Sequence, residues 1–144
     1  MKKNILITGC SSGLGLALTN YYLQKGFKVY GISRNKPEIQ NQNFIHISFD
    51  LSKILEIKTS LTTILKEIKN LDLVFLNAGM LGKIKILKEL SIEEMQEVYS
   101  LNVYANKELL DILMQIDVKN IFIISSGASK TGYKGWGAYS LSKA

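Results

Sequence analysis

The chain contains very little cysteine, proline or histidine, and it lacks long apolar runs. Among its 144 residues, Cys10 is the one cysteine, Pro37 the one proline and His46 the one histidine. A single cysteine excludes an internal disulfide and fits a reducing compartment, so we expect a cytoplasmic protein. No stretch approaches the roughly 20 apolar residues of a membrane span, and the apolar run at residues 5–7 is too short for a signal peptide. We therefore expect neither a membrane anchor nor a cleaved leader.

The charge of the chain is positive but dispersed. The formal net charge is +6, and 47% of the residues are hydrophobic. A basic surplus attracts nucleic acid, and it also attracts cofactors that carry phosphate. The lysines form no stripe with interleaved aromatic residues, so we expect no nucleic-acid partner, and we predict no metal site. The length and composition predict one globular domain, residues 1–144.

Short apolar runs alternate with longer amphipathic ones along the chain. The short runs predict strands at 4–8, 28–33, 44–49, 71–76 and 120–125. The longer runs predict helices at 13–24, 52–69 and 92–115, and a last helix that starts near Ala138. Ser91 and Glu94 are spaced as a capping box. The alternation indicates an α/β fold with a doubly wound parallel sheet, in the strand order 3-2-1-4-5.

A glycine-rich turn separates the first predicted strand from the first predicted helix. Residues 8–15 read T-G-C-S-S-G-L-G. Glycine permits positive φ angles and close approach of the backbone to a ligand, and the helix start offers N–H groups to a pyrophosphate. In this context a nucleotide cofactor is favoured over a tight connection without a ligand.

The spacing T-G-x-x-x-G-x-G resembles that of the short-chain dehydrogenase/reductase family, and the resemblance extends over the whole chain. It implies a Rossmann-like fold, a nicotinamide cofactor and a small carbonyl or alcohol substrate. From the turn, the resemblance implies cofactor contacts by Gly9, Ser11, Ser12, Gly13, Leu14 and Gly15. Later motifs add Asp50, Leu51, Asn77, Ala78 and Gly79. The last three form an N-A-G that resembles the family's N-N-A-G, with Leu76 in place of the first asparagine.

The end of the second predicted strand bears on the choice of cofactor. An acidic residue there would bind a ribose diol, but this chain has Ser33 and Arg34. A guanidinium can pair with a 2′-phosphate through two hydrogen bonds. The pattern resembles that of family members that prefer NADP, so we predict NADP (NADPH) rather than NAD. The alternative is that Arg34 is a plain surface charge.

Tyr139 and Lys143 lie four residues apart, on one face of the last predicted helix. A nearby ammonium stabilises a phenolate, so such a tyrosine can exchange a proton with a carbonyl or alcohol oxygen. The pair also resembles the family's serine-tyrosine-lysine site, which implies cofactor contacts by both residues. The spacing to Tyr139 assigns the serine to Ser126, with Ser125 as the alternative. Asn102 matches a helix-kinking asparagine that feeds a proton relay in the family.

Finer features resemble carbonyl reductases that act on benzil- and sepiapterin-like diketones. These are Gly127-Ala128-Ser129 and the segment 135–139, in which Trp136 either lines the substrate pocket or packs the loop. We expect a structural or surface role for His46 and no chemistry at Cys10.

Family members continue well beyond the catalytic lysine, whereas this sequence stops at Ala144. The resemblance therefore implies a sheet that is incomplete at its C-terminal end, and a homo-oligomer for the full-length form. We expect the isolated 144 residues to be unstable or self-associating and weakly active at most. The alternative function is a truncated, non-catalytic nucleotide-binding or interaction module.

Overall fold

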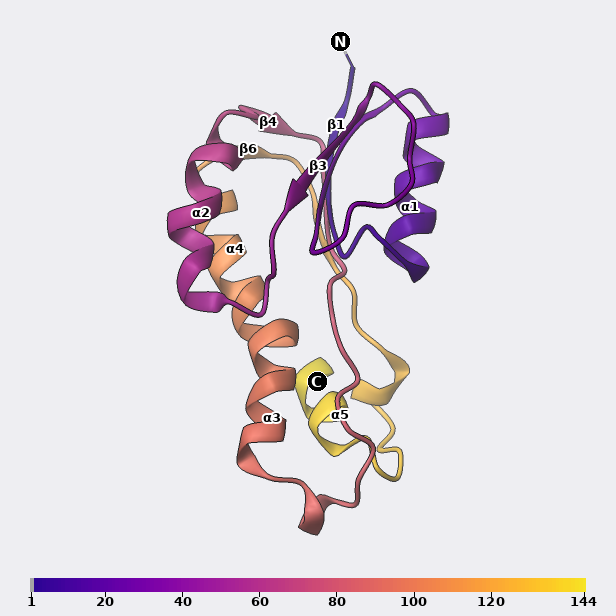
Figure 1. Cartoon of the computed structure of the whole chain (residues 1–144), viewed down its shortest axis with the longest axis vertical. Helices are drawn as coiled ribbons and strands as arrows, with labels where there is room; N and C mark the ends of the chain where they lie inside the picture. Colours follow the sequence, from indigo (N-terminus) through magenta and orange to yellow (C-terminus); the bar gives the residue numbers. More distant parts are fainter. Residues whose placement is uncertain (1) are drawn as a thin grey trace.

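The computed structural model describes residues 2–144, which form a five-stranded parallel sheet with helices on both faces (Figure 1). The sheet is built from β1 (Asn4–Thr8), β2 (Lys28–Ser33), β3 (Phe44–Ser48), β5 (Leu73–Leu76) and β7 (Ile121–Ile123). These strands lie in the order β3-β2-β1-β5-β7, which is the predicted order. The predicted α/β, Rossmann-like fold is thus confirmed.

Two apolar clusters pack the sheet between its helices. Helix α1 (Gly13–Gln24) covers one face, while α2 (Ile54–Lys66) and α4 (Ala105–Leu113) cover the other (Figure 1). On the central strand, Ile5 and Ile7 join the cluster on the α1 side, and Leu6 joins the cluster on the α2 and α4 side. Because both faces are covered, β1 is a continuous apolar run rather than an alternating one.

A polar residue divides the strand predicted at 71–76. Asp72 lies between the two strands that the structure forms here, and its carboxylate accepts hydrogen bonds from the backbone N–H of Asn4 (2.9 Å) and from Lys119 Nζ (2.6 Å). The residues before it form β4 (Asn70–Leu71), which pairs with β6 (Asp117–Val118) in a separate two-stranded sheet. Only Leu73–Leu76 continue as β5.

The helix predicted at 92–115 changes its geometry midway. It consists of α3 (Ile92–Tyr99), a π-helical turn η2 (Ser100–Tyr104) and α4. The capping box of Ser91 and Glu94 at the start of α3 is confirmed. The short elements η1 (Leu87–Glu89) and η3 (Gly127–Ser129) precede α3 and α5 (Gly137–Lys143), respectively. Helices α3 and α5 lie beyond the carboxyl ends of the strands (Figure 1).

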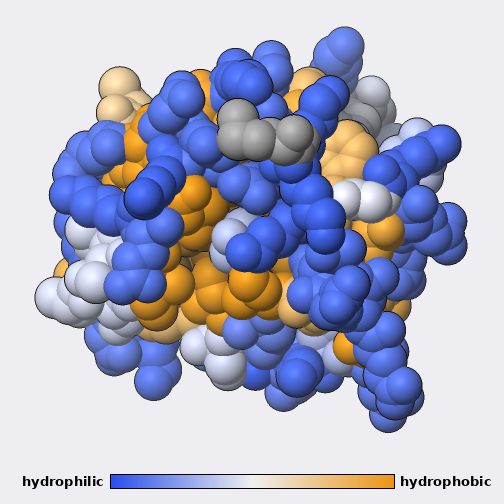
Figure 2. All heavy atoms as spheres, turned by 90° about the horizontal axis from the view of Figure 1, so that it is seen from above, coloured by the Kyte–Doolittle hydropathy of each residue, from blue (hydrophilic) through white to orange (hydrophobic). Residues whose placement is uncertain are grey.

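The surface is hydrophilic over most of the face in Figure 2, with hydrophobic residues visible between the polar ones. Strand β7 exposes apolar side chains at the edge of the sheet, namely those of Ile121, Phe122 and Ile123. The ring of Phe122 stacks on that of Phe75 at a centroid distance of 5.1 Å. Within residues 2–144, no helix is both long and apolar enough to cross a membrane.

Candidate active site

Two adjoining cavities lie at the carboxyl edge of the sheet. The larger, about 650 Å³, is lined by ten of the residues predicted to bind cofactor: Gly9, Ser11, Ser12, Ser33, Arg34, Asp50, Leu51, Asn77, Ala78 and Gly79. The smaller, about 360 Å³, is lined by Leu14, Tyr139 and Lys143 together with Asn77 and Gly79. Gly13 and Gly15 line neither cavity. Parallel sheets of this type bind ligands at the carboxyl ends of their strands, which is where both cavities lie.

The glycine turn is tightly packed beneath the larger cavity. Gly9 and Gly13 have positive φ angles of 69° and 52°. A methyl group on Gly15 would lie 2.0 Å from the carbonyl oxygen of Gly9, so this position admits no side chain. The start of α1 at Ser12 has no side-chain cap. Its first N–H groups are therefore available to a phosphate.

Thr8 fastens the glycine turn to the end of β5. Its buried Oγ1 accepts hydrogen bonds from the backbone N–H groups of Asn77 and Ala78, both at 2.9 Å. In return, Asn77 Nδ2 donates to the carbonyl oxygen of Thr8 at 3.1 Å. The sequence prediction did not assign a role to the Thr8 side chain, because its partners lie almost 70 residues away.

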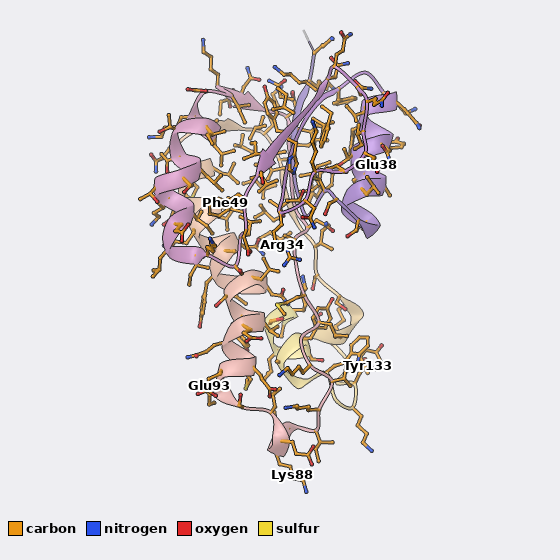
Figure 3. All side chains as sticks on the ribbon, in the orientation of Figure 1. Arg34, Glu38, Phe49, Lys88, Glu93 and Tyr133 are labelled. Atoms are coloured by element: carbon orange, nitrogen blue, oxygen red, sulfur yellow. The ribbon has the colours of Figure 1, made fainter. Side chains whose placement is uncertain are left out.

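The end of β2 places a cation at the larger cavity. Arg34 is exposed and lies at the end of the sheet that faces α3 and α5 (Figure 3). Ser33, by contrast, is only 7% exposed, and its hydroxyl donates to the carbonyl oxygen of Asn35 at 2.7 Å. Arg34 is thus the side chain of this pair that is free to meet a ligand.

Asp50 supplies a carboxylate to the same cavity. Ser52 donates to Asp50 Oδ1 from both its hydroxyl (2.7 Å) and its backbone N–H (3.0 Å). These hydrogen bonds, with a smaller contribution from the charges of Arg34 and Lys53, lower the pKa of Asp50. Neither side chain caps α2, which begins at Ile54 after Lys53. The carboxylate is ionised at neutral pH, and Oδ2 can accept a hydrogen bond from a ligand.

The smaller cavity brings Tyr139 and Lys143 together. Lys143 Nζ lies 5.9 Å from the centroid of the Tyr139 ring and donates to the carbonyl oxygen of Ile124 at 2.8 Å. Burial lowers the pKa of Lys143. Trp136, which also lines this cavity, packs edge-to-face on Tyr139 with a centroid distance of 5.8 Å. The phenol, the ammonium and an indole therefore share one wall.

The two candidate serines make different contacts. Ser125 lines the smaller cavity, and its hydroxyl donates to the carbonyl oxygen of Lys143 at 3.1 Å. Ser126 does not line it; Ser126 Oγ accepts a hydrogen bond from the backbone N–H of Ala128 at 3.2 Å. The proton of Ser126 is thereby left free to donate, whereas that of Ser125 is engaged.

Asn102 lies at the π-helical turn and is 5% exposed. Its Oδ1 accepts a hydrogen bond from the backbone N–H of Met80 at 2.8 Å, and its Nδ2 donates to the carbonyl oxygen of Met80 at 2.9 Å. Asn102 Nδ2 also donates to Ser142 Oγ at 2.9 Å. The side chain therefore ties the segment after β5 to helix α5, which carries Tyr139 and Lys143.

Three residues of the segment after β5 connect the cavities: Asn77, Gly79 and Met80 line both. A methyl group on Gly79 would lie 3.2 Å from Asn102 Oδ1 and 3.4 Å from Lys143 Nζ. A side chain at this position would thus crowd both Asn102 and Lys143. The sequence prediction did not include Met80, since nothing in a lone methionine after N-A-G signals its contact with Asn102.

The family model of the short chain dehydrogenases matches residues 3–144, so the chain belongs to that family. It is 35% identical over 149 residues to a benzil reductase ((S)-benzoin forming) of Bacillus subtilis, covering 96% of this chain and 61% of that protein. Among solved structures, a short chain dehydrogenase family protein of Francisella tularensis is similar with a TM-score of 0.90 and 30% identity. That match covers 99% of this chain and 59% of the other.

A further solved structure, a 4-hydroxyisoleucine dehydrogenase complexed with NADH, matches with a TM-score of 0.80 and 27% identity. It covers 99% of this chain and 63% of the other. The 144 residues thus span about three-fifths of the length of the relatives that they match. The family resemblance inferred from the motifs is confirmed, and the protein is a member of an oxidoreductase family.

Proposed function

We propose that this protein is an NADP-dependent oxidoreductase that interconverts a carbonyl and an alcohol, with Ser126, Tyr139 and Lys143 as its catalytic residues. One observation carries the proposal. The cavity beside the glycine turn and the cavity beside Tyr139 and Lys143 adjoin, and they share Asn77, Gly79 and Met80 as walls. A dinucleotide bound along the first would extend into the second.

The residues of the larger cavity fit such a cofactor. The turn at Gly9 and Gly13 and the uncapped start of α1 suit a pyrophosphate. Asp50, which lines this cavity, would accept a hydrogen bond from an adenine amine, and Gly79 has no side chain to crowd Lys143. When bound, a nicotinamide supplies or accepts the hydride, and the protein has to bind it, orient the substrate and move one proton.

Tyr139 is the proposed proton donor in the direction of carbonyl reduction. Its hydroxyl would give a proton to the carbonyl oxygen, or take one from an alcohol in the reverse direction. Lys143 uses one of its three protons for Ile124, so two remain for neighbouring oxygens. Ser126 would donate to the same substrate oxygen and stabilise its developing charge. Asn102, bound to Met80 and Ser142, is the proposed link to a proton relay.

The preference for NADP over NAD is part of the proposal. The end of β2 offers the guanidinium of Arg34 to the larger cavity, and residues 28–34 contain no carboxylate. A ribose diol would find no acidic partner there, whereas a 2′-phosphate would find a bidentate one. The structural relative with NADH bound shows that the family's fold also accommodates the unphosphorylated cofactor.

The proposed substrates are aromatic diketones of the benzil type. The Bacillus subtilis relative is a benzil reductase, and the smaller cavity has an apolar wall of Leu14, Met80 and Trp136. An aryl ring packs well against an indole. We also propose a cytoplasmic location and a homo-oligomeric full-length form, as the family resemblance implies.

The test is NADPH oxidation with a panel of diketones. The proposal expects oxidation that depends on benzil or a related diketone and that is faster with NADPH than with NADH. Tight cofactor binding without turnover on any carbonyl would instead favour a non-catalytic nucleotide-binding module.

A further inference from the structure

A partly buried hydrogen-bond hub, centred on Ser33, lies next to Arg34 in the sequence. Ser33 Oγ donates to the carbonyl oxygen of Asn35 at 2.7 Å. Ser33 Oγ also lies 2.9 Å from His46 Nε2 and 3.2 Å from Cys10 Sγ. A hydroxyl has one proton and two lone pairs, and a carbonyl oxygen only accepts. The Ser33 hydroxyl therefore donates its proton to the carbonyl oxygen of Asn35, and it accepts hydrogen bonds from the Nε2–H of His46 and the S–H of Cys10.

This arrangement uses all the hydrogen-bonding capacity of the Ser33 hydroxyl. The hydroxyl donates once and accepts twice, and the residue is 7% exposed. It has no proton left for a ribose hydroxyl or a phosphate. Recognition at the 2′ position therefore falls to Arg34.

The hub and its neighbours hold the backbone on both sides of Arg34. The carbonyl oxygen of Ser33 accepts from the N–H of Phe49 at 3.1 Å, and that of Arg34 accepts from Ser48 Oγ at 3.3 Å. The carbonyl oxygen of Asn35 is held by the hub. Three successive peptide groups are thus fixed, two of them directly by residues at the end of β3. An exposed arginine on a fixed backbone loses less entropy when it binds than one on a mobile loop.

We propose that His46 is a positioning residue for cofactor recognition: through Ser33 it holds the turn that presents Arg34 to the 2′-phosphate of the nicotinamide cofactor. This inference rests on the proposed preference for NADP. His46 itself touches no part of the larger cavity. Its effect should therefore appear in the affinity for the phosphorylated cofactor and be absent for the unphosphorylated one.

The experiment measures the dissociation constants of NADPH and NADH by calorimetry. His46→Phe keeps an aromatic ring but removes the donor. We expect it to weaken NADPH binding about tenfold, the effect of one hydrogen bond, and NADH binding less than about twofold. His46→Gln restores an N–H donor and should recover most of the NADPH affinity. Ser48→Ala, at an exposed position, should weaken NADPH binding by a few-fold and covers the case in which His46→Phe does not fold.

Arg34→Ala separates the inference from the function on which it rests. Alone it should weaken NADPH binding by about ten- to a hundredfold, and His46→Phe should then add nothing in the Arg34→Ala background. If Arg34→Ala leaves the preference in affinity for NADPH over NADH unchanged, both the proposed cofactor preference and the role of His46 are overturned. In the other case, Arg34→Ala lowers the preference for NADPH, while His46→Phe and Ser48→Ala weaken the binding of both cofactors equally or of neither. Only the positioning role is then overturned.

Discussion

Ser125 donates a hydrogen bond from its hydroxyl to the carbonyl oxygen of Lys143, at 3.1 Å. The bond connects the segment after β7 to the last turn of α5, near the Lys143 ammonium. It also occupies the only proton of Ser125, although this residue lines the cavity of Tyr139. The hydroxyl proton of Ser125 is thus used in a structural hydrogen bond, whereas that of Ser126 remains free to donate.

We therefore expect Ser126→Ala and Ser125→Ala to differ in kind. Ser126→Ala should lower kcat about a hundredfold, because it removes the proposed donor to the substrate oxygen. Ser125→Ala should have a small effect on kcat and should lower the thermal stability slightly. Rates of NADPH oxidation with benzil at high protein concentration, and melting curves for both variants, make the comparison. A large loss of kcat in Ser125→Ala alone would move the catalytic role to that serine.

The glycine turn offers a matched pair of substitutions. Gly15→Ala would place a methyl group 2.0 Å from the Gly9 carbonyl oxygen and 2.6 Å from Asn77 Nδ2, so the turn has to open. Gly13→Ala meets nothing within 4 Å, and its cost is the positive φ of 52°, about 1–2 kcal/mol. We expect NADPH binding to be lost in Gly15→Ala and largely kept in Gly13→Ala, as measured by calorimetry. Wild-type affinity in Gly15→Ala would contradict the turn geometry.

Glu94 anchors the segment before α3. It contacts Lys85 Nζ at 2.6 Å and Lys83 Nζ at 3.0 Å, and it accepts the backbone N–H of Ser91 at 3.0 Å. The hydrogen bond from Lys85, followed by those from Ser91 and Lys83, lowers the pKa of Glu94 from its usual 4.5 to about 2. A carboxylate whose pKa falls on folding stabilises the protein fully above its unfolded pKa and loses that effect as the pH falls through the folded one.

This stabilisation should consequently disappear as the pH falls from about 4.5 to 2. Glu94→Gln retains a side chain that can complete the capping box but loses the charge, so it should melt at a lower temperature than the wild type at pH 7. The difference in Tm should shrink through the stated range, as followed by circular dichroism. Glu93→Gln, at an exposed neighbouring position, is the control. A Tm difference that is independent of pH would show that the charge of Glu94 is irrelevant.

The exposed edge strand predicts association. Ile123 is 55% exposed on β7, at the margin of the sheet, where unpaired backbone groups can join another chain. We expect the 144-residue chain to self-associate and Ile123→Lys to reduce this association in sedimentation velocity experiments. Leu55→Lys, on α2 and 91% exposed, removes an apolar side chain away from the edge and should have little effect. Equal association in both variants would exclude the edge as the cause.

Much of the fold could be predicted because its signals are local. The bounds predicted for the first strand, first helix and second strand agree with β1, α1 and β2, since glycines and apolar periodicity mark their ends. The split at Asp72 could not be predicted, because it depends on Asn4 and Lys119, which lie far away in sequence. The pairing of β4 with β6 involves two residues in each strand and leaves no periodic pattern.

The sequence predicted which residues line the candidate site better than it predicted which of them contact each other. Motif spacing identified most of the residues that line the larger cavity, including Arg34 and Asp50. It gave no indication that Asn102 holds Met80, since that pairing depends on where the π-helical turn meets the segment after β5. Likewise, the contact of His46 with Ser33 depends on the register between β3 and β2.

Tyr139→Phe tests most directly whether the Tyr139 hydroxyl transfers the proton, as we propose. The ring and its packing on Trp136 are kept, and only the hydroxyl is removed. In single-turnover reactions of NADPH with benzil at high protein concentration, we expect the variant to be at least about a hundredfold slower than the wild type, with an unchanged dissociation constant for NADPH. Equal rates of NADPH oxidation in the two proteins would contradict the claim.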